Sequence, residues 1–304
     1  TIELGRMLFY EKMLSKDSSV SCGSCHQQKY AFSDPKQFSE GVDKAFGSRN
    51  AMAIINMVFE KKFFWDGRSN SLEEQALDPI TNPLEMNLSL DEAISRLTNS
   101  DIYQTEFQKC FGENSITKEN LAKAISQFER TLISDQSPYD LYKQGKGNLT
   151  EQEKRGEKLF FTHPDPIYAT RGGNCGDCHS GPLTTSRLFA NNGLDNPIID
   201  IGLEQVTKNS NDKGRFKIPT LRNIELTAPY MHDGRFQTLE DVLDHYNEHI
   251  QNSPTLDVQI INASNETNRK TLALTQQEKE DILAFLKTLT DQNFIENSKF
   301  SNPF

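Results

Sequence analysis

The sequence predicts a mainly α-helical protein with two domains, few short strands and long loops. The chain has 304 residues, more than a single domain usually holds. Apolar residues recur at helical spacing in several segments, whereas alternating strand patterns are rare. The motif Cys-x-x-Cys-His occurs once in each half, at residues 22–26 and 175–179. We therefore expect one copy of a similar helical unit in each half.

Each half begins with a helix that leads to its motif. Leu8 and Phe9 lie at helical spacing before the first motif, and Leu159 and Phe160 do so before the second. A threonine and a glutamate, Thr150 and Glu153, have the spacing of a reciprocal N-cap pair. We accordingly predict domains at 1–145 and 146–304, with the last residues, about 25, packing back on the first domain.

Further helices are predicted where a hydroxyl residue precedes an acidic first turn or an apolar periodic stretch. These helices cover residues 89–97, 117–132 and 238–246, and one begins at Thr275, with Glu278 completing its cap. Polar segments at 191–216 and 250–269 are predicted to be loops. Loops of this length in a compact domain often line functional sites.

The composition limits the partners of the chain. Its formal charge is -10 and its isoelectric point is about 5.2, which argues against nucleic acid and favours a partner with a basic face. No apolar run approaches the roughly 20 residues that cross a bilayer, so we expect no membrane span. Thr1 leads directly into a helical pattern, which we interpret as the start of a mature or trimmed chain.

The Cys-x-x-Cys-His motif is typical of covalent haem attachment, because two cysteines bind the haem edge while the next histidine reaches the iron. A four-cysteine zinc site usually separates its pairs by about 15 to 20 residues, and a thioredoxin-like dithiol needs a strand–helix setting. Neither alternative fits. We predict two c-type haems and a periplasmic location, with haem bound through these residues: Cys22, Cys25, His26, Cys175, Cys178 and His179.

The second axial ligand of each iron decides between electron transfer and reaction with a small molecule. The first half contains no histidine besides His26. In the second half, Met231 lies on a proline-bearing loop suited to presenting one ligand, with Tyr230 or His232 as alternatives. The segment 65–73 repeats the pattern of 232–240, which places Phe64 at the position of Met231. Since Phe cannot bind iron, the first haem is predicted to be open or closed from elsewhere.

At this point the sequence resembles the bacterial di-haem cytochrome c peroxidases and, more broadly, their superfamily with the methylamine-utilisation di-haem enzymes. The resemblance covers nearly the whole chain. It is carried by these segments: Ser24-Cys25-His26, Ser48-Arg49-Asn50, Phe64-Trp65-Asp66-Gly67-Arg68, Leu72-Glu73-Glu74-Gln75-Ala76, Asn82-Pro83-Leu84-Glu85-Met86, Ile218-Pro219-Thr220-Leu221-Arg222-Asn223 and Pro229-Tyr230-Met231-His232-Asp233-Gly234.

The resemblance implies a role for several residues. The first haem would be the peroxidatic centre, and the second would receive electrons from a small redox protein. Trp65 matches the tryptophan that lies between the haems in the family. Glu85 matches the distal acid–base residue that peroxide cleavage requires, and Gln75 matches a neighbouring amide. Asn50 matches a ligand of a calcium ion between the haem domains, an ion that prefers oxygen ligands.

One position departs from the typical peroxidase. Val42 stands where many members carry the distal histidine that blocks the resting peroxidatic haem. We therefore predict a first haem that binds peroxide without prior reduction, as in the methylamine-utilisation enzymes. Those enzymes carry tyrosine at the position of Met231, so Met231 favours a peroxidase.

The sequence thus predicts reduction of hydrogen peroxide to water, with electrons from a basic cytochrome c or a small copper protein. A peroxide-dependent oxidase of a protein or small molecule and a non-catalytic electron carrier are the alternatives. Many relatives dimerise, so a homodimer is considered. Cys110 is predicted to be a buried packing thiol, and His245 and His249 receive no role.

Overall fold

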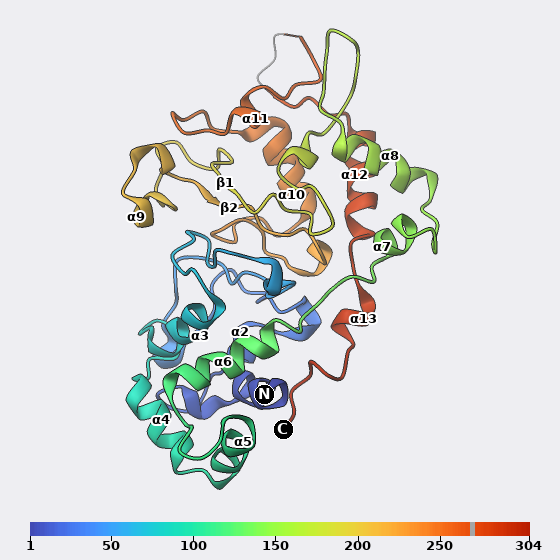
Figure 1. The fold of residues 1–304 in the computed structure, drawn as a ribbon. Helices are drawn as coiled ribbons and strands as arrows, with labels where there is room; N and C mark the ends of the chain where they lie inside the picture. Colours follow the sequence, from blue (N-terminus) through green and yellow to red (C-terminus); the bar gives the residue numbers. More distant parts are fainter. Residues whose placement is uncertain (268–270) are drawn as a thin grey trace. The chain divides into compact units, whose positions relative to one another are not determined.

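The structure, a computed structural model, describes residues 1–267 and 271–304. The described residues are mainly helical, as predicted, and contain one two-stranded antiparallel sheet of β1 (Phe189–Ala190) and β2 (Phe216–Lys217) (Figure 1). The chain divides into two compact units. Unit 1 holds residues 1–63, 69–133 and 293–304, and unit 2 holds residues 64–68 and 134–292.

Unit 1 is organised by the packing of α1 (Ile2–Tyr10) against α6 (Lys118–Glu129). A Cβ atom on Gly5 would lie 1.9 Å from the backbone oxygen of Ala124, so only glycine permits this close approach. Next to this crossing, the rings of Phe9 and Phe128 lie 5.3 Å apart. The other helices of the unit are α2 (Cys22–Cys25), α3 (Leu72–Thr81), α4 (Leu90–Thr98) and α5 (Asp101–Phe111).

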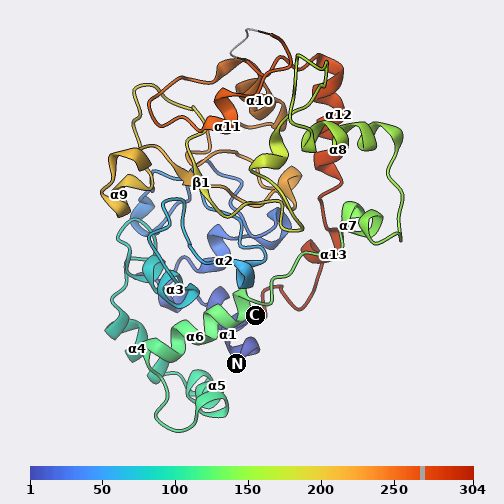
Figure 2. The same cartoon turned by 45° about the horizontal axis from the view of Figure 1, so that its top comes forward.

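Unit 2 repeats the same crossing with α8 (Glu151–Phe161) and α12 (Gln276–Lys287), which lie side by side in Figures 1 and 2. A Cβ atom on Gly156 would lie 1.9 Å from the backbone oxygen of Asp281. The rings of Phe160 and Phe285 are 5.2 Å apart. The remaining helices are α7 (Pro138–Lys143), α9 (Glu204–Thr207), α10 (Leu239–Asp244) and α11 (Val258–Ile261), and α13 (Gln292–Ile295) spans the division between the units.

The predicted helix starts are confirmed. Thr150, Thr238 and Thr275 each form a capping box, and Ser89 and Thr117 each accept a hydrogen bond from an amide of the first turn. Such caps are local, which explains why they are readable from sequence. The predicted helix ends are less accurate. α6 ends at Glu129 and not at 132, and α10 passes into a π-helical turn (His245–His249).

Two of the predicted loops contain short helices, which corrects the prediction of loops without regular structure. The segment 191–216 includes α9, and the segment 250–269 includes α11, while residues 268 and 269 lie outside the described residues. Each is a single turn too short for a periodic signal. The sequence pattern does not predict α3, because the helix contains Pro79, a residue that usually interrupts a helix.

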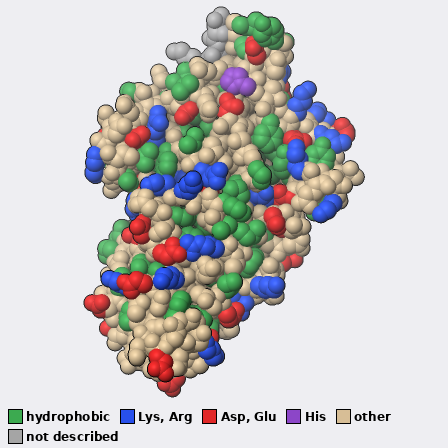
Figure 3. Space-filling model, viewed as in Figure 1, with side chains coloured by type: hydrophobic (Ala, Val, Ile, Leu, Met, Phe, Trp, Pro, Cys, Tyr) green, Lys and Arg blue, Asp and Glu red, His purple; other side chains and the backbone are tan. Residues whose placement is uncertain are grey.

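The units differ in extent from the predicted domains, 1–145 and 146–304. Residues 134–145 and the short segment 64–68 belong to unit 2. Residues 293–304 belong to unit 1, where the Tyr10 hydroxyl donates to the backbone oxygen of Phe300 at 2.7 Å. No helix in the described ranges is long and apolar enough to cross a membrane. On the face shown in Figure 3, acidic and basic side chains are interspersed, so the negative charge is not gathered there.

Candidate haem sites

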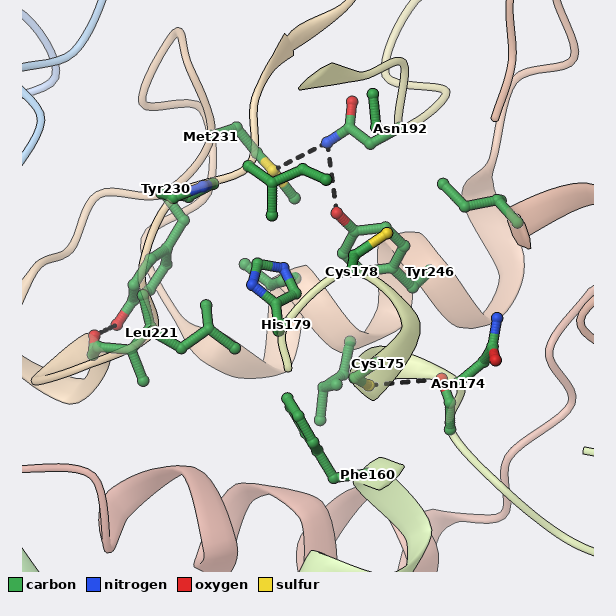
Figure 4. Close-up of a pocket in the computed structure, with 18 of the residues that line it drawn as sticks. Phe160, Asn174, Cys175, Cys178, His179, Asn192, Leu221, Tyr230, Met231 and Tyr246 are labelled. Atoms are coloured by element: carbon green, nitrogen blue, oxygen red, sulfur yellow. Dashed lines mark hydrogen bonds between the residues drawn. The ribbon is translucent and has the colours of Figure 1, made fainter. Parts of the chain in front are cut away.

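A large pocket in unit 2 brings together the second motif and Met231 (Figure 4). Cys175, Cys178 and His179 line it, and so does the side chain of Met231. Most other lining residues are apolar, among them Phe160, Ala190, Phe216, Ile218, Pro219, Leu221, Ile224, Tyr230, Leu239, Val242, Leu243, Ile250, Ile260, Ala263, Leu272, Ile282 and Leu286. The pocket therefore combines two thiols, an imidazole and a thioether within apolar walls.

His179 is oriented to bind a metal through its outer nitrogen. Its Nδ1 lies 3.1 Å from the backbone oxygen of Thr184, so Nδ1–H donates there and Nε2 is left with a free lone pair. Burial lowers the pKa of His179 to about 4, which keeps the ring in the neutral form that binds iron. Burial also raises the pKa of the Cys178 thiol to about 11.

Met231 occupies a tight loop with left-handed backbone, φ 75°. The loop closes through a bridge between Tyr230 and Phe236, and Gly234 donates its amide hydrogen to the Met231 carbonyl at 3.2 Å. The sulfur accepts a hydrogen bond from Asn192 Nδ2 at 3.3 Å. A thioether sulfur has a second lone pair, which this contact leaves for a metal.

The two alternative ligands are already engaged. The Tyr230 hydroxyl donates to the backbone oxygen of Ile224 at 3.0 Å. The His232 ring stacks on Phe216, with ring centroids 3.7 Å apart. Both residues line the pocket, and the hydrogen bond of the Tyr230 hydroxyl disfavours Tyr230 as the ligand.

The donor set fits a c-type haem. Apolar walls suit a large planar ring, the two thiols suit thioether attachment, and His179 with Met231 suits axial ligation. No group of three or more His, Cys, Asp or Glu residues that could hold a metal ion is found in residues 1–267 and 271–304.

In unit 1, the first motif lies on α2 and the residue after it. Ser21 and Ser24 form a capping box that begins this short helix, and His26 ends it. His26 Nδ1 lies 2.9 Å from the backbone oxygen of Phe32, the same arrangement as in the second motif. Burial lowers the pKa of His26 and raises the pKa of Cys25 to about 11. The histidine and cysteines of the first motif thus have the same local arrangement as those of the second.

Glu85 lies near the first motif. Its charge raises the pKa of both Cys22 and Cys25, in addition to the larger effect of burial. Asn82 Nδ2 donates to Glu85 Oε1 at 2.7 Å, which holds the carboxylate. Val42 is only 1% exposed, and its amide donates to the Glu85 backbone oxygen at 2.8 Å. The position that departs from the typical peroxidase is therefore joined to the predicted acid–base residue.

The other predicted site residues are distributed over both units. Gln75 is half-buried on α3 of unit 1. Asn50 is buried in unit 1 and its Nδ2 donates to the backbone oxygens of Lys36 and Gln37. Trp65 belongs to unit 2, where it lines the pocket and its carbonyl accepts from the Lys217 amide at 2.8 Å. The calcium role of Asn50 stays a prediction.

The repeated loops in the sequence have the same backbone form. Phe64, like Met231, has left-handed backbone, φ 65°. Phe63 forms a bridge with Ser69, and the Gly67 amide donates to the Phe64 carbonyl at 3.2 Å. The Arg68 guanidinium lies 3.3 Å from the centre of the Phe64 ring. One loop thus presents a sulfur where its repeat presents an aromatic ring.

Two residues of the second pocket were not predicted to be functional. Asn192 lies in a polar segment that was predicted only as a loop, and Tyr246 lies on the π-helical turn after α10. In Figure 4, dashed lines join the Asn192 amide to the Met231 sulfur and to the Tyr246 hydroxyl. π-Helical turns are often found at functional sites, but their hydrogen-bond pattern is not readable from sequence.

Comparison with known proteins agrees with this chemistry. The sequence model of a family described as di-haem cytochrome c peroxidase matches residues 1–148. Cytochrome c551 peroxidase of Nitrosomonas europaea is 35% identical over 293 residues, which cover 95% of this chain and 79% of that protein. The chain belongs to the di-haem cytochrome c peroxidase family. Membership confirms the predicted resemblance, the haem and peroxidase character, and a complement of two haems.

The family also includes proteins of another kind. The methylamine utilization protein MauG of Methylorubrum extorquens is 34% identical over 304 residues, which cover 95% of this chain and 77% of that protein. A solved structure of a MauG-like protein associated with microbial copper homeostasis is 36% identical, with a TM-score of 0.85 over 99% of this chain and 92% of that one. The chain is therefore similar both to cytochrome c peroxidases and to MauG proteins.

Proposed function

We propose that the chain is a cytochrome c peroxidase that reduces hydrogen peroxide to water with electrons from a small redox protein. The observation that carries the proposal is the difference between the two repeated loops. Met231 presents a thioether to the pocket of the second motif, whereas Phe64, at the same backbone position, has no group that binds iron. When bound, two c-type haems would supply the electron transfer and the reduction of peroxide.

Each haem has its own protein ligands in this proposal. Cys22 and Cys25 would attach the first haem through thioethers, and His26 would bind its iron. Cys175 and Cys178 would do the same for the second haem, and His179 and Met231 would bind its iron. A Cys-x-x-Cys-His motif and a hydrogen-bonded Nδ1 in both units support this assignment.

Residues of unit 1 carry out the proton transfer. Cleavage of the O–O bond to give water requires a proton to move between the two oxygens. Glu85 performs this transfer, and Asn82 holds its carboxylate through the 2.7 Å hydrogen bond. Gln75 orients the peroxide. Val42 has no group that binds iron, so the first site would be open in the oxidised protein and would need no prior reduction.

Electron entry is assigned to unit 2. Trp65 lines the pocket of the second motif and offers an aromatic ring on the electron path. The net charge of -10 favours a basic cytochrome c, or a small copper protein, as the donor. A periplasmic location follows from covalent haem attachment, and a calcium ion bound by Asn50 and a homodimer complete the proposal by family resemblance.

The test is the peroxide-dependent oxidation of reduced cytochrome c by the diferric holoprotein, without prior reduction. We expect Glu85→Gln to lower kcat by about 100-fold or more, because general acid–base catalysis contributes on that scale. The matched control is Glu113→Gln, which changes an exposed carboxylate and should retain activity. Equal turnover by the Glu85 variant would refute the role of this residue.

A peroxide-dependent oxidase of a protein or small molecule is the second candidate. The 34% identity to MauG favours it, as does Val42 at the predicted distal position. In that case peroxide is consumed while reduced cytochrome c is not. A non-catalytic electron carrier predicts low-spin iron at both haems, so a high-spin signal in electron paramagnetic resonance of the resting protein excludes it.

A further inference from the structure

Asn192 lies in the wall of the unit 2 pocket beside the Met231 sulfur. Its Nδ2 donates to Met231 Sδ at 3.3 Å and lies 3.4 Å from the Tyr246 hydroxyl oxygen (Figure 4). Both contacts use the same amide nitrogen, which carries two hydrogens. One side chain therefore links the candidate ligand to the wall of the pocket.

The backbone of Asn192 is fixed on both sides. His245 Nε2 lies 2.9 Å from the Asn192 backbone oxygen. The neighbouring Asn191 is buried, and its Nδ2 donates to Ser253 Oγ and Thr255 Oγ1 at 3.0 and 2.9 Å. These anchors fix the backbone from which the Asn192 side chain reaches the sulfur, so no backbone entropy is lost in forming the contact.

Tyr246 assists as a neutral partner. Burial raises its pKa to about 12, and the hydrogen bond from Asn192 opposes this effect only partly. The phenol therefore carries no charge at neutral pH. Its hydroxyl oxygen accepts from the second amide hydrogen of Asn192, which keeps the amide plane directed at the pocket.

We propose that Asn192 is a positioning residue for Met231, which directs one sulfur lone pair toward the haem iron and raises the reduction potential of the second haem. The inference rests on the ligand role of Met231 in the proposed function. A donor on the sulfur withdraws electron density and makes the thioether a weaker donor to ferric iron. The reduced state is favoured as a result.

The repeated loop gives an internal contrast. At the position of Met231, Phe64 turns its ring toward the Arg68 guanidinium, at 3.3 Å from the ring centre. That contact is a cation–π interaction and orients no ligand. The amide-to-sulfur arrangement thus belongs to the copy that carries the candidate ligand, as expected for a device that serves ligation.

The experiment compares the holoprotein with its Asn192→Leu variant, which keeps the size of the side chain and removes the donor. We expect the potential of the second haem to fall and the methionine-to-ferric-iron absorption band to shift or weaken. A hydrogen bond of ordinary strength changes the reduction equilibrium by roughly two- to tenfold. Tenfold corresponds to about 59 mV for one electron.

A second variant and a control make the outcome decisive. Asn192→Asp retains the shape but places an acceptor near the sulfur. This variant should also lower the potential and shift or weaken the band, which keeps the test decisive even if Asn192→Leu fails to fold. Asn211→Leu changes an exposed amide of the same unit and should leave potential and band unchanged.

The possible failures are distinguishable. If both Asn192 variants keep the band at the position found in wild type and the second haem keeps its wild-type potential, the inference is overturned and the Met231 assignment stays intact. A wild-type holoprotein without a methionine band would overturn the ligation by Met231, and the inference with it.

Discussion

The carboxyl group of Glu129 is the most informative target for a stability measurement. This residue ends α6, is 2% exposed, and its Oε2 has no hydrogen-bond partner among the described residues. Burial raises its pKa to about 8, the nearby Arg130 lowers it, and Glu73 raises it further. Arg130 pairs with Glu73 at 2.8 Å, which limits how far Arg130 stabilises the charged form of Glu129.

The direction of the pH effect follows from proton binding. The ordinary pKa of the carboxyl is 4.5, so between about pH 4.5 and 8 the folded protein holds a proton that the unfolded chain has released. The contribution of Glu129 to stability is therefore complete below pH 4.5 and is lost as pH rises toward 8. Between pH 5 and pH 8 the loss amounts to about 3 to 4 kcal/mol, because the slope is about 1.4 kcal/mol per pH unit and becomes smaller as the pH approaches 8.

The test is urea denaturation of wild type and Glu129→Gln at pH 5 and pH 8, followed by circular dichroism. Glutamine stays neutral, so the variant should match wild type to within about 1 kcal/mol at pH 5 and exceed it by about 3 to 4 kcal/mol at pH 8. Glu119→Gln, an exposed change on the same helix, should show no such gain. A stability difference that is the same at both pH values would refute the reasoning.

Three further substitutions test the packing and the pairing of unit 2 by thermal unfolding. Gly156→Ala should cost about 3 kcal/mol or lose the fold, because its Cβ would lie 1.9 Å from a backbone oxygen; Gly47→Ala, with open space around it, should cost little. Arg222→Met should cost about 3 kcal/mol, since Asp140 loses a 2.7 Å ion pair where both side chains are largely buried. Thr150→Ala should cost about 1 kcal/mol through the lost N-cap, and an unchanged midpoint would contradict each expectation.

The sequence predicts what depends on neighbours along the chain. Caps such as Thr150 and Thr238 act within one turn, and the repeated loops at Phe64 and Met231 are recognisable because their spacing is retained. The crossing of α8 and α12 through Gly156 was not predicted, since a single glycine in a helix carries no signal for its partner.

Contacts between distant residues limit the prediction of the site. The hydrogen bond from Asn192 to Met231 joins a polar loop to another loop, and nothing in either local pattern indicates the pairing. Glu129 gave no signal either, because glutamate is rarely buried without a partner and is assigned to the surface by default.

The left-handed backbone at Met231 and Phe64 has a consequence for how such proteins change over evolution. β-Branched side chains are strongly disfavoured there, so valine, isoleucine and threonine are poor replacements. Unbranched ligands such as methionine, tyrosine and histidine satisfy the same backbone. Replacing the one residue at this position can therefore change the ligand, and with it the chemistry, without remodelling of the loop.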